Sequence, residues 1–445
     1  MFGKILIANR GEIAVRVIRA CRDMGIVSVA VYSEADRNAL HTQLADESIC
    51  IGPALSRDSY LNANQIIGAA LASRADAIHP GYGYLSENAA FAQACEDYGV
   101  TFIGPSPKAL LLLGDKARAI ETARNADVPT VPGSDGALPD VKSAKECAKR
   151  VGFPLMLKAA AGGGGRGIRL LRDVSEVEAA YSAASAEAQS FFGDGRLYIE
   201  KYIEHPRHIE FQILGDRHGT VIHLFERECS LQRRHQKMLE EAPSPFLTNQ
   251  KRAEMGEAAV RLAKAAGYYG AGTVEFLIDA NGRYYFMEMN PRIQVEHPVT
   301  ELVTGIDLVS EQIRIALGAP LGYAQQDIDI KGHAMECRVN AEDPEHAFAP
   351  RPGTIAGLHV PGGPGVRVDS AIYQGYAVPP YYDSLLAKLI VHGHDRTEAL
   401  ARMKRAMAEF LVEGVTTNCD FHLRLLGLDA FCNGDYSVDT IGEML

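Results

Sequence analysis

The feature that most restricts the fold is a predicted β-hairpin in residues 270–290, GAGTVEFLIDANGRYYFMEMN. Asn281-Gly282 is the strongest short signal for a two-residue type I′ turn. If these two residues form the loop, Glu275 lies directly opposite Glu288. Cross-strand partners share one face with Cβ atoms about 4.5–5.5 Å apart, so two like charges there require a positive partner.

The two glutamates share their face with Asn290, so the hairpin offers two carboxylates and an amide oxygen. Mg²⁺ and Mn²⁺ bind oxygen ligands of this kind and retain waters or phosphate oxygens. No cluster of histidines and cysteines indicates zinc instead. A solvated strand edge is the alternative, but the three oxygen groups favour a metal site made of Glu275, Glu288 and Asn290.

Polar residues continue past the hairpin at every second position of EMNPRIQVEH, residues 288–297. They are Glu288, Asn290, Arg292, Gln294 and Glu296. A period of two predicts an extended chain with one polar face. The alternatives are a solvent-facing edge or a surface ion pair between Arg292 and Glu296, which contributes little stability. The alternation with the candidate metal ligands favours the wall of an active site.

A second signal is an apolar strand that ends in Lys158 and is followed by the glycines of 162–165. A glycine run lets backbone N–H groups close on phosphate oxygens without obstruction. The stretch lacks the Walker pattern of a P-loop, and a flexible hinge is the alternative. Because a divalent metal is expected, we interpret the run as a lid over a nucleotide. Lys116 in LGDKARA is a further candidate cation, or else an ordinary exposed helix lysine.

Two other segments carry candidate contacts to anions. RHIEFQI, 207–213, alternates so that His208 belongs to a polar face. QRRHQK, 232–237, is strongly basic for an acidic protein and is either a solvated loop or an anion-facing segment. In the second interpretation His235 and Lys237 contact phosphate or a small anion.

A chain of 445 residues predicts two or three domains. Over the first hundred residues, strands predicted at 4–8 and 27–32 flank a helix, which is the pattern of a parallel α/β unit. No G-x-G-x-x-G motif follows the first strand, so NAD binding is disfavoured. Pro105 and Pro107 mark one boundary, and a further block begins near residue 331.

Composition excludes several classes of function. The formal net charge of −11 argues against nucleic acid as the main partner, and no apolar run is long enough to span a bilayer. The first residues lead directly into a predicted strand without a signal peptide. The eight cysteines form no C-x-x-C pair, as expected of reduced thiols. We therefore expect a cytoplasmic protein.

Together these motifs resemble those of the biotin carboxylases, members of the ATP-grasp superfamily. The resemblance covers essentially the whole chain and rests on ANRGEIA (8–14), IHPGYGYLSEN (78–88), LGDK (113–116), GGGGRG (162–167), residues 200–203, QRRHQK (232–237), EMNPRIQVEHPVTE (288–301), ECRVNAED (336–343) and VPPYYDS (378–384). It implies an α/β fold, α+β overall, in three parts. They are a Rossmann-like parallel domain over 1–113, an ATP-grasp domain over 114–330 with a mobile glycine-rich lid at about 131–203, and a mixed α+β domain over 331–445.

The resemblance also implies a reaction. ATP phosphorylates bicarbonate to carboxyphosphate, which releases CO₂ for capture by the ureido nitrogen of biotin, with Mg²⁺ or Mn²⁺ (two ions) as cofactor. The positions that match ATP contacts are Lys116, Lys158, Gly164, Gly165, Glu200, Lys201, Tyr202, Ile203, His208, Gln232, His235, Glu275 and Glu288. The positions that match the metal ligands, Glu275, Glu288 and Asn290, agree with the predicted hairpin.

The remaining matched positions concern bicarbonate and biotin. Those that match the bicarbonate site are Lys237, Arg292, Gln294 and the backbone of Val295. Glu296 matches the general base, Arg338 matches the cation that stabilises the biotin enolate, and Tyr82 and Gly83 lie in the loop beside biotin. The expected catalytic residues are Arg292, Glu296, Arg338 and Lys237. An arginine clamps a planar anion through paired N–H donors, and an adjacent carboxylate takes its proton.

No Ala-Met-Lys-Met sequence occurs, so we expect biotin to be carried by a separate biotin carboxyl carrier protein that also serves carboxyltransferase subunits, as in acetyl-CoA carboxylases built from several subunits. A subunit of a pyruvate or other acyl-CoA carboxylase would look similar, and the resemblance suggests a homodimer. Two alternatives stay open. Another ATP-grasp ligase does not account for Arg292, Glu296 and Arg338 together, and the full set of catalytic side chains disfavours a silent regulatory subunit.

Overall fold

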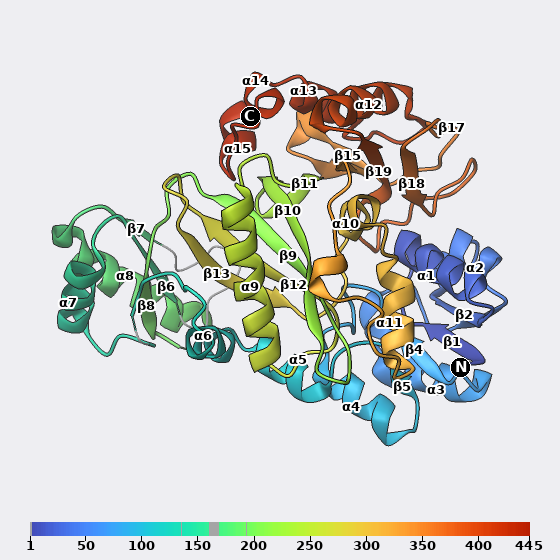
Figure 1. Cartoon of the computed structure of the whole chain (residues 1–445), viewed down its shortest axis with the longest axis horizontal. Coiled ribbons are helices and arrows are strands. Elements are labelled where there is room, and N and C mark those ends of the chain that lie inside the picture. Colours follow the sequence, from blue (N-terminus) through green and yellow to red (C-terminus); the bar gives the residue numbers. More distant parts are fainter. Residues whose placement is uncertain (1, 135, 160–168, 193) are drawn as a thin grey trace.

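The computed structural model describes residues 2–134, 136–159, 169–192 and 194–445 (Figure 1). Within these ranges a parallel sheet, a long antiparallel sheet and a small three-stranded sheet organise the chain. In Figure 1 the N-terminal part lies at the lower right, the small sheet at the left and the C-terminal helices at the top. The predicted mixed α/β architecture is confirmed. The glycine run that includes Gly164 and Gly165 lies outside the described residues.

The N-terminal sheet is parallel, with the strand order β3-β2-β1-β4-β5. Its strands are β1 (Lys4–Ile7), β2 (Val27–Tyr32), β3 (Glu47–Cys50), β4 (Ala77–His79) and β5 (Thr101–Phe102). Its helices are α1 (Gly11–Asp23), α2 (Leu40–Leu44), α3 (Ala63–Ser73), α4 (Ala89–Asp97) and α5 (Pro107–Gly114). The strand order reverses between β1 and β4, and the loops after these strands flank the switch point where such sheets bind ligands. Tyr82 lies in the loop after β4.

The loop after β4 is held in place by Asn9, which follows β1. The Asn9 side-chain amide donates to the carbonyls of Pro80 and Tyr82, both at 2.7 Å. Gly81 lies between these carbonyls at a φ of +63°, and a Cβ there would lie 2.8 Å from the Asn9 amide nitrogen. Glycine is therefore required at this position both for its backbone conformation and for the close approach.

The long sheet is antiparallel throughout, in the order β13-β12-β9-β10-β11-β14-β19-β18. Its strands are β9 (Arg207–Gly215), β10 (Val221–Arg233), β11 (Gln236–Ala242), β12 (Gly270–Ile278), β13 (Tyr284–Asn290), β14 (His333–Asn340), β18 (Val366–Ser370) and β19 (Leu385–Gly393). The helices of this part are α6 (Lys116–Asn125), α9 (Asn249–Ala265), α10 (His297–Thr304) and α11 (Leu308–Ala316). The sheet crosses the expected boundary at residue 331, and the three-part division remains a proposal.

Both faces of β9 are buried, although only one of them is apolar. Ile209, Phe211 and Ile213 pack into the core beneath α9. His208 and Glu210, on the opposite face, are 4% and 0% exposed. Buried polar and charged groups require partners, so this face of the sheet must carry a paired network.

The small sheet has the order β7-β6-β8. Its strands are β6 (Leu155–Ala159), β7 (Arg169–Leu171) and β8 (Leu197–Lys201), packed with α7 (Val141–Val151) and α8 (Val177–Phe192). The C-terminal part adds α12 (Arg396–Glu409), α13 (Cys419–Leu426), α14 (Asp429–Cys432) and α15 (Thr440–Met444), with the strand pairs β15 (Glu342–Asp343) with β16 (Ala349–Pro350) and β17 (Gly357–His359) with β20 (Leu411–Glu413). Short 3₁₀ turns cover Glu34–Asp36, Ser56–Asp58, Val174–Glu176, Gln325–Asp327 and Pro344–His346.

The hairpin of β12 and β13 differs from the predicted two-residue turn. Asp279 and Arg283 close a three-residue loop, in which the Gly282 amide donates to the Asp279 carbonyl at 2.9 Å. Gly282 has a φ of +75° and Asn281 does not lie in the left-handed region, so the turn is not type I′. A register shift after Glu275 offsets the extra loop residue, and Glu275 still pairs with Glu288.

The extended conformation predicted for 288–297 is wrong beyond Asn290. β13 ends at Asn290, residues 291–296 form an irregular loop with a turn, and α10 begins at His297. Pro291 supplies no N–H to continue the ladder, which is one physical reason for the strand to end. The polar side chains of this loop nevertheless line the cleft described below.

All eight cysteines are free, as the sequence predicts. No helix within the described ranges is long and apolar enough to cross a membrane.

Candidate active site

A cleft of about 880 Å³ opens on the polar face of the long sheet, beside β6 and β8. Most of the predicted site residues line it, namely Lys158, Glu200, Lys201, Tyr202, Ile203, His208, Gln232, His235, Lys237, Glu275, Glu288, Asn290, Arg292, Gln294, Val295, Glu296 and Arg338. Lys116 is the first residue of α6 and is not part of this lining. Tyr82 and Gly83 line a separate cavity of about 350 Å³ beside α1.

Lys237, near the start of β11, is the central cation of the cleft. Its ammonium lies 2.5 Å from the carboxylate of Glu210, 2.6 Å from Glu296 and 3.2 Å from Glu275. Burial works against the charge, but these three carboxylates outweigh it and hold the pKa of Lys237 well above its usual value. Lys237 is therefore charged at neutral pH.

Glu296 has a cation on each carboxylate oxygen. Lys237 donates to Oε1 at 2.6 Å and Arg338 donates to Oε2 at 2.9 Å. Burial alone would raise the pKa of Glu296, but Lys237, Arg338 and Arg227 hold it well below the usual range. Glu296 is thus ionised, which a general base must be before it can accept a proton.

Arg338, on β14, is anchored by a residue that the sequence did not single out. Its Nε and Nη2 lie 2.7 and 2.5 Å from Oε1 of Glu240 on the neighbouring strand β11. Glu240 is fully buried, and burial raises the pKa of Glu240 to about 7 against the opposing effect of Arg338. One guanidinium therefore bridges Glu240 and Glu296.

Arg227 on β10 is a second residue that the sequence did not single out. Its guanidinium is 0% exposed and donates to Glu210 at 2.5 Å, to Gln212 at 2.7 Å and to Gln294 at 3.1 Å. It also donates to the hydroxyls of Thr273 and Thr300 at 3.0 Å. The alternation that places His208 on the polar face of β9 places Glu210 there too. This pattern could have predicted Glu210 as a member of the buried network around Arg227. Arg227 gave no comparable signal.

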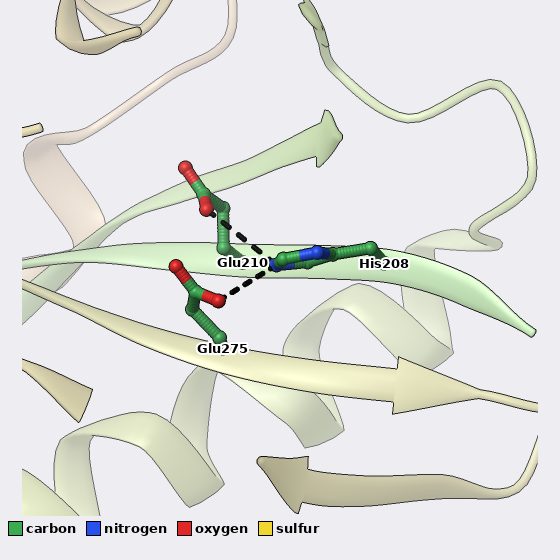
Figure 2. Close-up of side chains that lie close together, drawn as sticks. All are labelled: His208, Glu210 and Glu275. Carbon is green, nitrogen blue, oxygen red and sulfur yellow. Dashed lines mark ion pairs between the residues drawn. The ribbon is translucent and has the colours of Figure 1, made fainter. Parts of the chain in front are cut away.

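His208, Glu210 and Glu275 converge from two neighbouring strands (Figure 2). The His208 ring lies 2.9 Å from Glu275 and 3.8 Å from Glu210. Burial alone would raise the pKa of Glu275, but Lys237 and His208 hold it far below its usual value. Candidate ligand atoms of these three residues lie within 4.8 Å of one another, but Lys237 already supplies the cation between the two carboxylates.

Glu288 and Glu275 are the residues that fit a divalent cation. They are direct partners across β12 and β13, and burial in the cleft together with the Glu275 charge raises the pKa of Glu288. No hydrogen bond or ion pair engages the Glu288 carboxylate anywhere in the part of the chain that the structure describes. The Asn290 side-chain NH₂ donates to Glu275 at 2.8 Å, and its oxygen accepts from Arg292 at 3.1 Å, so Asn290 lies beside the pair. The donor set is oxygen-rich and anionic, as Mg²⁺ requires.

Arg292 also lines the cleft, and its side chain is partly exposed. Its Nε donates to Glu87 at 2.6 Å, and its Nη2 donates to Asn290 at 3.1 Å. Gln294 is buried and donates to Glu275 at 2.8 Å. On the opposite wall, the Lys158 ammonium pairs with Glu200 at 2.5 Å. Lys237 connects the two parts of the cleft, because its ammonium contacts both the candidate metal ligand Glu275 and Glu296.

Comparison with known proteins agrees with this geometry. Residues 1–110 match the model of the biotin carboxylase N-terminal domain, residues 115–324 that of the carbamoyl-phosphate synthase L chain ATP-binding domain, and residues 336–443 that of the biotin carboxylase C-terminal domain. A biotin carboxylase of Nostoc sp. is 58% identical over 443 residues, which are 100% of this chain and 99% of the relative. The chain belongs to the biotin carboxylase family.

This biotin carboxylase is an ATP-dependent carboxylase of the ATP-grasp type. It is also 52% identical to a pyruvate carboxylase subunit of Methanothermobacter thermautotrophicus, over 100% of this chain and 90% of that relative. The biotin carboxylase domain dimer of Hydrogenobacter thermophilus 2-oxoglutarate carboxylase, solved with MgADP, ADP and bicarbonate, superposes with a TM-score of 0.91 at 52% identity. That match covers 100% of this chain and 98% of the solved one.

Proposed function

We propose that this biotin carboxylase carboxylates biotin on a separate carrier protein, as the first half-reaction of an acetyl-CoA carboxylase. The observation that carries the proposal is the position of Glu296, a buried carboxylate held between Lys237 and Arg338. The same cleft contains the Glu275–Glu288 pair. A base, two fixed cations and a metal site are together what the activation of bicarbonate by ATP requires.

ATP occupies the lid end of the cleft in this proposal. The residues we assign to it are Lys116, Lys158, Gly164, Gly165, Glu200, Lys201, Tyr202, Ile203, His208, Gln232, His235, Glu275 and Glu288. Glu275, Glu288 and Asn290 hold Mg²⁺, and Mn²⁺ suits the same oxygen ligands. When bound, the metal neutralises and orients the phosphates for in-line transfer.

Bicarbonate binds between Arg292 and Lys237 in this proposal, with Gln294 and the Val295 backbone completing its site. A bound anion competes with Glu296 for the Lys237 and Arg338 cations. Those cations lower the pKa of Glu296. When they also interact with a bound anion, their effect on Glu296 is weaker, so its pKa rises and it becomes a stronger base. The arrangement thus links substrate binding to the activation of the base.

Biotin approaches the other side of Glu296. Arg338 is anchored by Glu240, so its guanidinium is already oriented to stabilise negative charge on the ureido oxygen of biotin. Tyr82 and Gly83, which line the separate cavity beside α1, are also assigned to biotin. In this proposal the biotin is supplied by a carrier protein that also meets carboxyltransferase subunits.

The final acceptor of the carboxyl group has a specific alternative. The relatives include a 2-oxoglutarate carboxylase domain and a pyruvate carboxylase subunit, both at 52% identity. A subunit of a pyruvate or other acyl-CoA carboxylase is therefore the second candidate. Transfer from carboxylated biotin to acetyl-CoA or to pyruvate in a reconstituted system decides between the two. We also propose a homodimer, since the compared structure is a dimer, and a cytoplasmic location, which the eight free cysteines support.

One assay tests the reaction. Phosphate release from ATP and bicarbonate is measured with and without free biotin, in the presence of Mg²⁺. We expect biotin to stimulate phosphate release and to become carboxylated. Bicarbonate-dependent release that biotin leaves unchanged would favour another ATP-grasp ligase. Absence of any release would favour a silent regulatory subunit.

A further inference from the structure

Lys388, on β19, is a buried lysine that the proposed mechanism does not use. Its side chain is 0% exposed. The ammonium donates to the backbone carbonyl of Val295 at 2.9 Å and lies 3.2 Å from Glu12 on α1. Asp369 on β18 is 3.8 Å away. Lys388 therefore joins the N-terminal part, the long sheet and the loop before α10.

Burying an ammonium is costly unless it is paired and hydrogen-bonded. Glu12 is 5% exposed and Asp369 is 4% exposed, so the counter-charges are buried as well. Asp369 is already paired with Arg367 at 2.7 Å, which leaves Glu12 as the nearer partner of Lys388. The buried ammonium also donates a hydrogen bond to an uncharged backbone carbonyl, that of Val295. This contact indicates that Lys388 fixes the position of the Val295 carbonyl.

The carbonyl in question belongs to the turn that presents the bicarbonate site. Val295 lies between Gln294 and Glu296, whose side chains bond Glu275 and Lys237. α10 begins with a tightened turn, in which Val299 donates to the Glu296 carbonyl at 3.4 Å. The Val295 carbonyl therefore accepts a hydrogen bond from Lys388, which lies outside α10. Any movement of this carbonyl would turn the Val295 peptide and shift the base.

The other end of the contact series reaches the cavity beside Tyr82. Oε1 of Glu12, which lies close to Lys388, also accepts a short hydrogen bond from the Tyr82 hydroxyl. Tyr82 and Glu12 both line this cavity of about 350 Å³. Lys388 in turn lies directly opposite Arg338 in the ladder of β14 and β19. The series Tyr82, Glu12, Lys388 and Val295 therefore runs from a residue assigned to biotin to the assigned bicarbonate loop.

We propose that Lys388 is a positioning residue of the bicarbonate site, and that the series Tyr82–Glu12–Lys388–Val295 couples the binding of biotin to the binding of bicarbonate. This inference rests on the proposed function and adds a route by which one substrate affects the other. Coupling between two sites is reciprocal, so biotin that orders Tyr82 also lowers the bicarbonate concentration that the enzyme needs.

Two variants test the proposal. Lys388→Met removes the donor to Val295 but leaves Glu12 buried without its cation, so we expect a lower melting temperature. The double variant Lys388→Met with Glu12→Gln replaces the ion pair with neutral side chains of similar shape, a change that commonly restores stability. Lys251→Met, on α9, is the matched control. Melting temperature, the KM for ATP and the half-saturating bicarbonate concentration are measured for each by phosphate release.

In the wild type we expect the half-saturating bicarbonate concentration to fall about fivefold or more between low and saturating free biotin. In the double variant we expect it to be raised roughly tenfold at saturating biotin, through loss of a charge-assisted hydrogen bond, and to be independent of biotin. The KM for ATP and the melting temperature stay close to those of the wild type.

A double variant with the wild-type bicarbonate requirement would show that Lys388 is only a structural ion partner, and the proposal would be wrong. If the half-saturating bicarbonate concentration of the double variant is raised but still falls with biotin as in the wild type, the coupling through Glu12 and Tyr82 would be wrong. Wild-type enzyme without bicarbonate-dependent phosphate release would refute the proposed function and this inference together. Wild-type activity with unaltered variants would refute the inference alone.

Discussion

The Lys237 ammonium, on β11, donates at 2.6 Å to the carboxylate of Glu296, the residue just before α10. The same ammonium donates to Glu210 at 2.5 Å on β9. Lys237 is therefore fixed by the sheet whether or not Glu296 is present. This separation of roles makes it possible to remove the base without moving the cations around it.

Glu296→Ala tests the assignment of the base. We expect the variant to lose bicarbonate-dependent phosphate release and biotin carboxylation, because no other ionised carboxylate in the described chain lies between Lys237 and Arg338. Loss of a general base typically costs roughly 10²–10⁴-fold in rate. ATP binding, measured by calorimetry, stays largely intact because the Glu275–Glu288 pair is untouched. A large loss of nucleotide affinity would instead make Glu296 a structural residue.

Glu288→Gln tests the metal site. The substitution keeps the size of the side chain but removes the negative charge opposite Glu275. We expect the Mg²⁺ concentration for half-maximal phosphate release to rise roughly 10–100-fold, the range typical of damaged metal sites. Glu257→Gln on α9, an exposed site, is the matched control and leaves the requirement unchanged. An unchanged requirement in Glu288→Gln would exclude Glu288 as a ligand.

Glu240→Gln tests the anchor of Arg338. The amide oxygen still accepts a hydrogen bond, but the charge that faces the guanidinium is lost. We expect the catalytic efficiency for free biotin to fall about tenfold, as for other residues that orient an active-site group. The KM values for ATP and bicarbonate change much less. A uniform rise of all three KM values, with a lower melting temperature, would show that Glu240 acts only on the fold.

The pairing of Glu275 with Glu288 was predictable from the sequence, although the predicted turn was wrong. An extra residue in the loop and a register shift after Glu275 cancel each other. On its other side β13 contacts a segment far away in sequence, since the Phe286 amide donates to the Pro129 carbonyl at 2.7 Å outside the ladder with β12. Local turn signals contain no information about such a contact.

The residues that hold the site residues in place were less predictable from the sequence than the site residues themselves. Glu296 and Arg338 lie in motifs, but Glu240 and Arg227 become part of the site through the order and register of β10, β11 and β14. The pairing of β10 with β9 and β11 is interrupted by register shifts. A single shift of register moves a side chain to the other face of a sheet, so the buried network cannot be read from alternation alone.

Glu241, on β11, links the stability of the fold to acid pH. Glu241 is fully buried, accepts from Arg396 at 2.8 and 3.0 Å, and lies 2.6 Å from His333. Burial alone would raise the pKa of Glu241, but His333 and Arg396 lower it to about 2. A depressed folded-state pKa contributes stability that is present above the unfolded-state pKa near 4.5 and is lost as the pH falls toward 2.

Glu241→Gln removes this ionisation. We expect the free energy of unfolding at pH 7 to fall by about 3 kcal/mol, which corresponds to the size of the pKa shift. Between about pH 4.5 and about pH 2, the window set by the two pKa values, the wild type loses stability more steeply than the variant. Denaturant unfolding at several pH values measures both quantities, with Glu257→Gln as control. Parallel pH curves for the variant and the wild type would show that Glu241 carries no linkage, because a titrating group that is removed must flatten the curve in its own window.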